Sequence, residues 1–320
     1  MSEYETLFAL GAGGLGQVTL CVRRDGRFER LFAVKRLRPI HAEDPEMRAM
    51  FEEEGRIAGL LSGRYTVPVV DAGNDARGHY IVMEYLDGMD LRVALRELGN
   101  QRALPLAIHA AATIAAQTAR ALDALHHLKD HHGVSLAAVH RDVSPQNILI
   151  GFDGQVRLTD VGIAKADGSA TNETRSGVLK GKPGYFAPEQ LRFEEVTGRA
   201  DIFALGVVLF EMLAGQRLFP SGCATDFRRS FDEPPPDLYD FVPDAPAELV
   251  DLLLRMLATS PQLRPTAREV AHALEALAVT QPEEDSLAAL IEDSFESWRG
   301  DRAEQIRLAL EELDARKTEE

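Results

Sequence analysis

The first part of the chain carries short apolar runs that predict strands, with one helix among them. Apolar runs on both sides of the glycine-rich turn at 11–16 predict a hairpin, and Leu31–Leu37 predicts a third strand. Asp44 and Pro45 predict the start of a helix through Leu61, because Asp is a good N-cap and Pro fits the first helical position. This part is therefore expected to be rich in strands.

After a further apolar strand at 80–86, the pattern becomes mostly helical. A strand at 156–162 is followed by a stretch opening at Asp201 that is apolar nearly all round, which predicts a buried helix. Pro261–Thr266 predicts the start of one more helix. Strands and helices thus separate along the chain, as in an α+β fold. The expected parts are residues 1–86, 87–280 and 281–320.

The segment 281–320 differs in composition from the preceding chain. After Pro282 it becomes acidic, and its apolar residues lie at helical spacing. These residues are Leu287, Leu290, Ile291, Phe295 and Trp298. Such a stripe most often docks on its own domain. The alternative is a homodimer or another protein bound through residues 287–298.

Residues 139–147, Val-His-Arg-Asp-Val-Ser-Pro-Gln-Asn, place two oxygen-bearing side chains in one short loop. Phosphoryl transfer needs a carboxylate that accepts or orients the acceptor hydroxyl, and an amide oxygen that holds a divalent ion on the nucleotide phosphates. Asp142 and Asn147 fit these roles. Asp160, in the Asp-Val-Gly that ends the strand at 156–162, is the predicted second metal ligand. An Asp-containing turn is the alternative for that tripeptide alone.

The glycine-rich turn reads Gly11-Ala12-Gly13-Gly14-Leu15-Gly16-Gln17-Val18. Glycines let backbone amides approach phosphates, but the pattern also occurs in dinucleotide-binding units and in plain turns. A strand follows Val18 where a dinucleotide-binding unit needs a helix, which favours a kinase-type loop. Lys35 lies in the next strand of a chain with only 6 lysines against 29 arginines. It is therefore expected to bind the α and β phosphates rather than to be casual surface charge.

Glu54, in the helix after Asp44, is the acid expected to pair with Lys35. Its neighbours Glu52 and Glu53 carry the same charge, and all three could form a solvated face. A lysine held for a nucleotide by a helical glutamate is typical of kinase sites, and this favours Glu54 for the pair.

With these motifs in order and Ala187-Pro188-Glu189 after them, the chain resembles a bacterial eukaryotic-like serine/threonine protein kinase over residues 4–280. The resemblance implies a two-lobed protein kinase-like fold, with a strand-rich small lobe and a helical large lobe. It implies ATP and Mg²⁺ as cofactors, and transfer of the γ-phosphate to Ser or Thr hydroxyls of protein substrates, including autophosphorylation. The Ala-Pro-Glu ending disfavours a small-molecule kinase of the same fold.

The resemblance also implies roles that the pattern leaves open. The strand at 80–86 looks like the hinge segment that carries the adenine, with Met83 at the back of the pocket and Asp90 at the ribose. Plain core and plain loop are the alternatives for these two residues. Asp201 would brace the catalytic loop, and Glu189 would pair with Arg264. The implied nucleotide-binding residues are Gly11, Gly13, Gly16, Val18, Ala33, Lys35, Met83, Glu84, Leu86 and Asp90.

Three positions depart from the family pattern. The lysine that most serine/threonine kinases carry two residues after the catalytic Asp is Ser144, and the threonine expected before Ala-Pro-Glu is Lys182. Because these positions face each other in the family fold, we interpret them as a swap in which Lys182 supplies the ammonium group and Ser144 a short hydroxyl partner. The alternative makes Lys182 a surface charge and Ser144 an inactivating loss. Val161 replaces the usual phenylalanine and, with Ser144, favours the competing class, a pseudokinase scaffold.

Regulation is expected between the second metal ligand and the Ala-Pro-Glu motif. Arg141 is a cation that needs an anion, and a phosphate on this segment could supply it. Thr174 and Ser176 lie at the offsets from Gly181 where bacterial relatives carry phosphorylated threonines. Autophosphorylation is therefore predicted at one or both. The alternative is that these hydroxyls only solvate a loop.

Composition limits the kinds of partner. The 320 residues carry a formal net charge of −16, which argues against nucleic acid. Cys21 and Cys223 have no spacing typical of a zinc site or a disulfide framework. The histidines at 126, 127, 131 and 132 lack acidic or cysteine partners in the sequence and are expected in an exposed loop. No apolar stretch is long enough to span a membrane, and a soluble cytoplasmic enzyme is expected.

Overall fold

The computed structural model describes residues 4–61, 63–101, 105–161, 182, 184–219 and 235–319. The chain divides into two compact units. The first unit contains Met1–Ser62, Val67–Asp87 and Phe295–Glu320, and the second contains Gly63–Thr66 and Gly88–Ser294.

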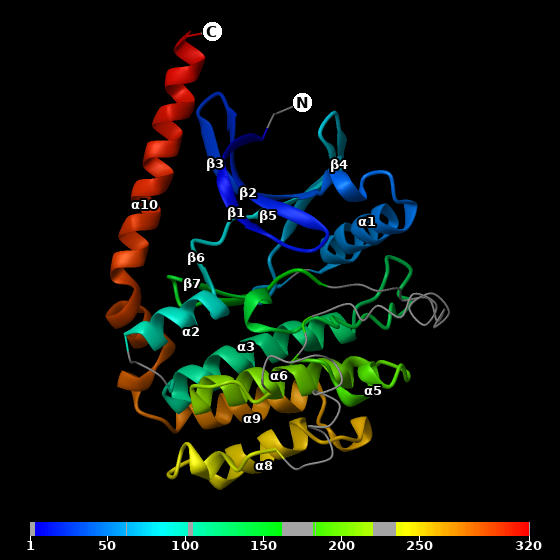
Figure 1. Cartoon of the computed structure of the whole chain (residues 1–320), viewed down its shortest axis with the longest axis vertical. Helices are drawn as coiled ribbons and strands as arrows, with labels where there is room; N and C mark the ends of the chain where they lie inside the picture. Colours follow the sequence, from blue (N-terminus) through cyan, green and yellow to red (C-terminus); the bar gives the residue numbers. More distant parts are fainter. Residues whose placement is uncertain are drawn as a thin grey trace. The chain divides into compact units, whose positions relative to one another are not determined.

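The first unit is built on an antiparallel sheet of strand order β1-β2-β3-β5-β4 (Figure 1). Its apolar core includes Cys21, Phe32, Val34 and Val82, which lie on neighbouring strands. The predicted hairpin and third strand are confirmed. The strands are β1 (Glu5–Ala12), β2 (Gly16–Asp25), β3 (Phe28–Leu37), β4 (Val69–Asp75) and β5 (Gly78–Glu84).

Helix α1 (Pro45–Leu60) belongs to the same unit and begins where the sequence predicts it. The Asp44 side chain accepts hydrogen bonds from the backbone N–H groups of Glu46, at 2.9 Å, and Met47, at 3.3 Å. These bonds satisfy two donors that the first helical turn leaves open.

The second unit is mainly helical, with a small antiparallel sheet. Its described helices of more than one turn are α2 (Leu91–Asn100), α3 (Ile108–His126), α6 (Gly198–Ala214), α8 (Ala247–Met256) and α9 (Ala267–Val279), with the single turn α5 (Pro188–Leu191). Its strands are β6 (Gly88–Asp90), β7 (Ile148–Gly151) and β8 (Val156–Leu158). Five short 3₁₀ turns are described in the chain: η1 (Pro39–His41), η2 (Pro145–Asn147), η3 (Leu238–Asp240), η4 (Pro261–Leu263) and η5 (Glu283–Asp285).

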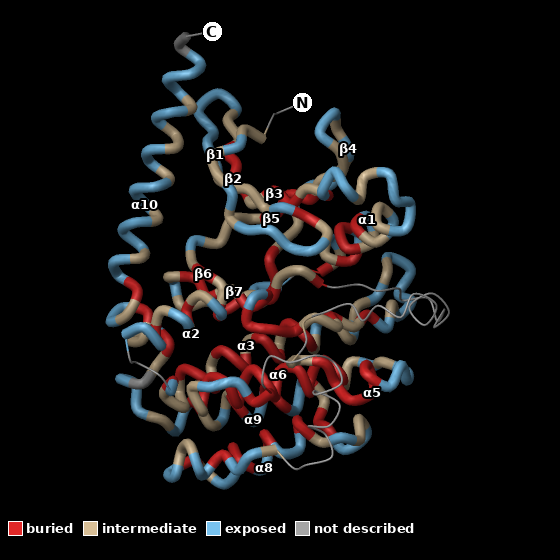
Figure 2. The backbone as a smooth tube through the Cα atoms, viewed as in Figure 1, coloured by how far each residue is buried: buried red, intermediate tan, exposed pale blue. Residues whose placement is uncertain are grey.

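Helix α6 is buried on every side from Ala200 to Leu213, as its apolar pattern predicts (Figure 2). It packs against α3, which in turn packs against α9. The helix begins at Gly198, before the predicted Asp201, because the Thr197 side chain accepts from the backbone N–H of Arg199 and caps it. It ends at Ala214 and is followed by Gly215, whose φ of 68° suits a left-handed C-cap.

The strand predicted at 156–162 is shorter than expected. Strand β8 ends at Leu158, and Asp160 has a φ of 53°, which is incompatible with continued strand pairing. The chain therefore leaves the sheet just before the carboxylate that the sequence assigns to a metal.

The segment after Pro282 forms α10 (Leu287–Glu319), a helix of 33 residues. Leu287, Ile291 and Phe295, part of the predicted stripe, are buried. Its first turns belong to the second unit, and the part from Phe295 onwards belongs to the first. Within the described residues, no helix combines the length with the apolar character needed to cross a membrane.

Candidate functional site

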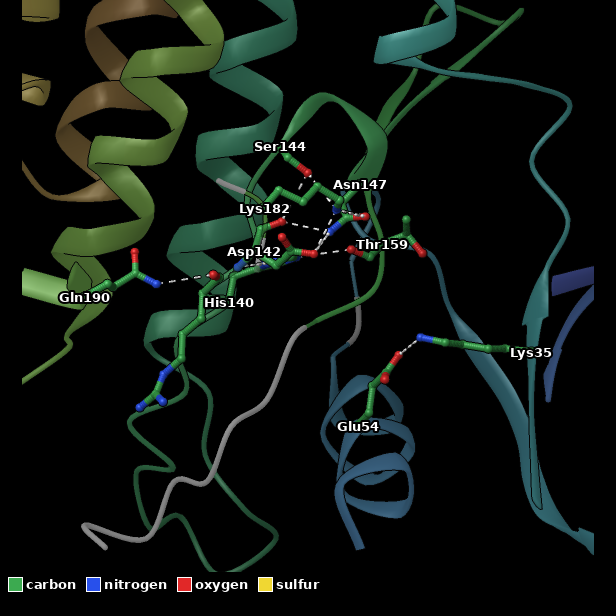
Figure 3. A network of polar contacts seen from close by, with 10 residues as sticks. Lys35, Glu54, His140, Asp142, Ser144, Asn147, Thr159, Lys182 and Gln190 are labelled. Atoms are coloured by element: carbon green, nitrogen blue, oxygen red, sulfur yellow. Dashed lines mark hydrogen bonds and ion pairs between the residues drawn. The ribbon is translucent and has the colours of Figure 1, made fainter. Parts of the chain in front are cut away.

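Lys35 and Glu54 form an ion pair in the first unit (Figure 3). Lys35 lies on β3 and Glu54 on α1, and they are only 7% and 8% exposed. The neighbouring glutamates face elsewhere: Glu52 lies 3.2 Å from His79, and Glu53 lies 2.7 Å from Arg56. Of the three candidate acids, the structure brings Glu54 to Lys35.

The glycine-rich turn joins β1 to β2 in the same unit. The N–H of Gly13 donates to the carbonyl of Gly16 at 2.8 Å, which closes the turn. A Cβ on Gly16 would lie 2.9 Å from the carbonyl oxygen of Arg36, so this position requires glycine. Val18 pairs with Lys35 across the strands. The turn and the lysine are thus parts of one rigid sheet.

The expected adenine-binding residues lie at the end of β5 and just beyond it. Met83 is 8% exposed and pairs with Ala33 on β3. Glu84 accepts a hydrogen bond from Arg30 at 2.7 Å, and the half-buried Leu86 follows the strand. These positions agree with a core role as well as with a pocket role, so the adenine contacts stay predictions.

Asp90 begins helix α2 in the second unit. Its side chain accepts from the backbone N–H of Val93 at 2.9 Å and caps the helix. A capping bond occupies one oxygen of the carboxylate and leaves further acceptor positions. The structure therefore shows Asp90 as the cap of α2, and its contact with the ribose stays a prediction.

Asp201 braces the catalytic loop from helix α6. Its carboxylate accepts from the backbone N–H of His140 at 2.9 Å and of Arg141 at 2.8 Å, where Arg141 has a φ of 63°. His126 Nε2 lies 2.8 Å from Asp201 Oδ2. Burial would raise the pKa of Asp201, but these hydrogen bonds, that of His126 first, outweigh it and hold the pKa below its ordinary value.

The position of His126 corrects the expectation that the histidines before the catalytic loop are exposed. His126 is the last residue of α3, and its side chain is 14% exposed. The prediction fails because it considers acidic partners nearby in the sequence, whereas Asp201 lies 75 residues further on. His127, His131 and His132 are exposed.

Asp142 lies at the centre of a polar cluster in the second unit (Figure 3). Asn147 Nδ2 donates to the Asp142 carbonyl at 2.7 Å and to its Oδ2 at 2.9 Å. Lys182 Nζ lies 2.9 Å from the same Oδ2, 3.0 Å from Ser144 Oγ and 3.4 Å from Asn147 Oδ1. The two positions that depart from the family pattern are therefore in direct contact, with the predicted base beside them.

Asp160 follows a segment that is tied to the catalytic loop. The N–H of Thr159 donates to the Asn147 carbonyl at 2.9 Å, and His140 Nε2 lies 3.1 Å from the Thr159 carbonyl. Val161, which is smaller than the usual aromatic, is buried at 5% exposure. The left-handed backbone at Asp160, like that at Arg141, concentrates strain beside the cluster.

Asn147 and Asp160 offer oxygen atoms, which are the ligands that Mg²⁺ prefers. Because Asn147 Nδ2 donates to Asp142, the Oδ1 atom, which lies 3.4 Å from Lys182 Nζ, is the side-chain atom suited to bind a metal. In the part of the chain that the structure describes, no three His, Cys, Asp or Glu residues gather into a metal site. The residues fit a magnesium ion that takes its other ligands from phosphate oxygens and water.

Glu189 and Arg264 form a buried ion pair in the second unit. Two guanidinium nitrogens bind the carboxylate at 2.6 and 2.8 Å, and the side chains are 2% and 0% exposed. Arg264 also donates to the carbonyl of Ala258 at 2.7 Å and lies over the ring of Phe203. Because the buried carboxylate and guanidinium are both hydrogen-bonded, we interpret this pair as a structural anchor.

Two further polar residues near the site were missed from the sequence. Gln190 accepts from the N–H of Ala187 at 2.9 Å and donates to the Arg141 carbonyl at 3.4 Å, so it links α5 to the catalytic loop (Figure 3). Glu211 on α6 accepts from the Tyr185 hydroxyl at 2.8 Å. Burial raises the pKa of Glu211 to about 7, and Tyr185 and Arg217 oppose the rise. An acid in the middle of the apolar run from Ile202 to Gly215 was the available signal for Glu211.

Thr174 and Ser176, the expected regulatory positions, lie outside the described residues, and so does Cys223. Arg141 lies within the described residues, and its binding to a phosphate on Thr174 or Ser176 stays a prediction. Cys21 is buried in the first unit.

Comparisons with known proteins give one consistent family. A model of the protein kinase domain matches residues 4–274. The chain is 39% identical over 282 residues to the tyrosine-protein kinase MasK of Myxococcus xanthus, covering 85% of this chain and 42% of that protein. It is 35% identical over 268 residues to the serine/threonine-protein kinase PknA of Mycobacterium tuberculosis, covering 82% and 58%. The chain thus spans about half the length of these relatives.

Solved structures give the same result for the fold. The crystal structure of the Mycobacterium tuberculosis PknI kinase domain matches with a TM-score of 0.63 and 29% identity, covering 85% of this chain and 95% of that one. The predicted fold class, with a strand-rich N-terminal part and a helical C-terminal part, is confirmed.

Proposed function

Since this chain belongs to the protein kinase domain family, we propose that it transfers the γ-phosphate of ATP to Ser or Thr hydroxyls of proteins, its own chain included. The observation that carries the proposal is the cluster of Asp142, Asn147, Ser144 and Lys182. It combines an oriented carboxylate, an amide oxygen and a cation within hydrogen-bonding reach.

Asp142 is the residue that receives or orients the proton of the acceptor hydroxyl. Asn147 and Lys182 both contact its Oδ2, which fixes the carboxylate in one orientation. Oδ1 is then the atom directed to the incoming hydroxyl. A carboxylate held in this way loses less freedom when the acceptor binds.

Lys182 supplies the positive charge that neutralises the transferring phosphoryl group. Its contact with Ser144 and Asp142 supports the swap with the missing catalytic-loop lysine. The same contacts weigh against the alternative in which Lys182 is ordinary surface charge and Ser144 is an inactivating loss. Mg²⁺, held through Asn147 and Asp160, would neutralise further charge on the nucleotide phosphates.

Lys35 is held for the α and β phosphates by Glu54. The five retained roles, of Lys35, Glu54, Asp142, Asn147 and Asp160, favour an enzyme over a pseudokinase scaffold. Autophosphorylation at Thr174 or Ser176, with Arg141 as the cation that binds the phosphate, forms part of the proposal.

The acceptor residue needs its own test, because one relative is named a tyrosine-protein kinase and another a serine/threonine-protein kinase. Phosphopeptide mapping after incubation with Mg-ATP distinguishes phosphotyrosine from phosphoserine and phosphothreonine. We expect Ser and Thr. Label found on Tyr alone would transfer the proposal to tyrosine phosphorylation.

The chemistry is tested by two substitutions. Asp142→Asn removes the base and Asp160→Asn removes a metal carboxylate, and each should reduce autophosphorylation by at least about a thousandfold with the fold intact. Asp153→Asn, which changes an exposed Asp in the β7–β8 turn, is the matched control and should keep wild-type activity. An Asp142→Asn or Asp160→Asn protein with the wild-type rate would overturn the proposed function.

A further inference from the structure

Helix α10 returns to the first unit and brings Arg302 to the strand that enters the glycine-rich turn. The Arg302 guanidinium lies 5.8 Å from the centre of the Phe8 ring. Phe8 lies on β1, close before Gly11, and the two side chains are both half-buried. A guanidinium over an aromatic face is attracted by the negative charge of that face.

Arg302 also interacts electrostatically with Tyr85, which lies in the hinge segment at 80–86 of the same unit. Burial first and Asp87 second raise the pKa of Tyr85 to about 12, and Arg302 opposes the rise. Tyr85 donates its hydroxyl to Asp87 at 3.3 Å. One guanidinium thus lies over Phe8 on the strand that enters the glycine-rich turn and interacts electrostatically with Tyr85 of the hinge segment.

Further contacts hold this part of α10 against the sheet. Lys317 lies 2.6 Å from Glu5 on β1, and Asp314 forms an ion pair with Arg24 on β2. On the helix, partly covered residues recur at the spacing of one face, in contrast to the exposed residues between them (Figure 2). They are Trp298, Arg302, Ile306, Ala309, Leu310 and Leu313. Arg302 is therefore presented from a docked helix and not from a free tail.

From this arrangement we infer that Arg302 is a positioning residue for the nucleotide, and that docking of α10 sets the affinity of the first unit for ATP. The inference rests on the proposed function, because it takes the glycine-rich turn and the hinge segment as nucleotide contacts. Arg302 restrains β1 and Tyr85 together, so the two segments lose less freedom when the nucleotide binds.

Calorimetric titration of the whole chain with Mg·ADP measures the effect directly. Arg302→Ala should weaken binding about three- to tenfold, with the KM for ATP raised to a similar extent and kcat within about twofold. Arg302→Lys keeps a cation over the Phe8 ring and should recover part of the affinity. Arg307→Ala is the matched control, because Arg307 contacts Glu304 and Glu311 of its own helix.

A double-mutant cycle separates this role from a loss of helix packing. Phe8→Leu removes the aromatic face but keeps an apolar residue on β1, and the effects of Phe8→Leu and Arg302→Ala on affinity should be clearly less than additive. A charge exchange tests the docking: Lys317→Glu should weaken binding of Mg·ADP, and adding Glu5→Lys should restore it.

The outcomes distinguish the proposed function from the role of Arg302. Wild-type chain that neither binds Mg·ADP nor transfers phosphate would overturn the proposed function together with this inference. Wild-type chain that binds and transfers, with Arg302→Ala equal to it in affinity, would overturn the role of Arg302 alone. A fall in kcat without a change in KM would do the same.

Discussion

Lys35 and Lys182 each bind a carboxylate, but the two pairs lie in different surroundings. The side chains of Lys35 and Glu54 are 9% and 11% exposed, whereas those of Lys182 and Asp142 are both 28% exposed. A buried ion pair must stay together, because separating it leaves a charge without water. A half-exposed pair can exchange its partners with little loss. The first pair therefore suits a fixed support, and the second suits a position beside the reacting groups, where Lys182 is open to a phosphoryl oxygen as well as to Asp142.

The largest expected effect comes from breaking the buried pair. Lys35→Ala leaves the Glu54 carboxylate buried without its lysine, and should lower the free energy of unfolding by about 3–5 kcal/mol in urea titrations. Lys35→Met combined with Glu54→Leu replaces both charges by apolar side chains and should recover most of that stability. A loss below about 1 kcal/mol in Lys35→Ala would show that the two pairs do not differ.

Substitution in the half-exposed pair of Lys182 and Asp142 should change the activity and leave the stability nearly unchanged. Lys182→Thr should reduce the phosphorylation rate about a hundredfold, because the cation near the transferring group is lost. Its free energy of unfolding should change by less than about 1 kcal/mol. Adding Ser144→Lys should restore much of the rate.

Lys129→Thr, at an exposed lysine outside the cluster, is the control for this series and should keep full activity. Additive losses in the Ser144→Lys, Lys182→Thr double variant would refute the swap. A wild-type rate in Lys182→Thr alone would make the lysine an ordinary surface residue.

Glu211 sharpens the comparison, because it is a buried acid whose hydrogen bond comes from the neutral hydroxyl of Tyr185. Its pKa is raised to about 7 in the folded chain from an ordinary value of 4.5, so the folded state holds a proton that the unfolded state has lost between these values. Stability should therefore fall as pH rises from about 4.5 to 7. Glu211→Gln should remove this slope and should be more stable than wild type at pH 8 by about 2 kcal/mol.

Thermal unfolding between pH 5 and pH 8 measures the Glu211 effect. Glu248→Gln, at an exposed glutamate of α8, is the control and should keep the wild-type slope. An unchanged slope in Glu211→Gln would mean that Glu211 is ionised in the folded chain throughout this range.

The sequence predicts the buried pair better than the contacts around the catalytic loop. Lys35 and Glu54 lie on a strand and a helix whose patterns are regular, so their elements can be located from periodicity and capping. His126 and Tyr185 escape such reasoning, because their partners lie 75 and 26 residues away on α6 and are set by tertiary packing. The Lys182 contact was predicted only because the family resemblance supplied the opposing position. Periodicity alone contains no signal for it.

Complete burial of α6 has a consequence for hydrogen exchange. From Ala200 to Leu213 the helix has neighbours on every side, so no local fraying can open its central amides to water. These amides should exchange with deuterium only when the second unit unfolds as a whole. Their exchange rates, followed by mass spectrometry, therefore report the global stability of that unit. They provide a common scale on which a substitution at the site can be separated into an effect on folding and an effect on chemistry.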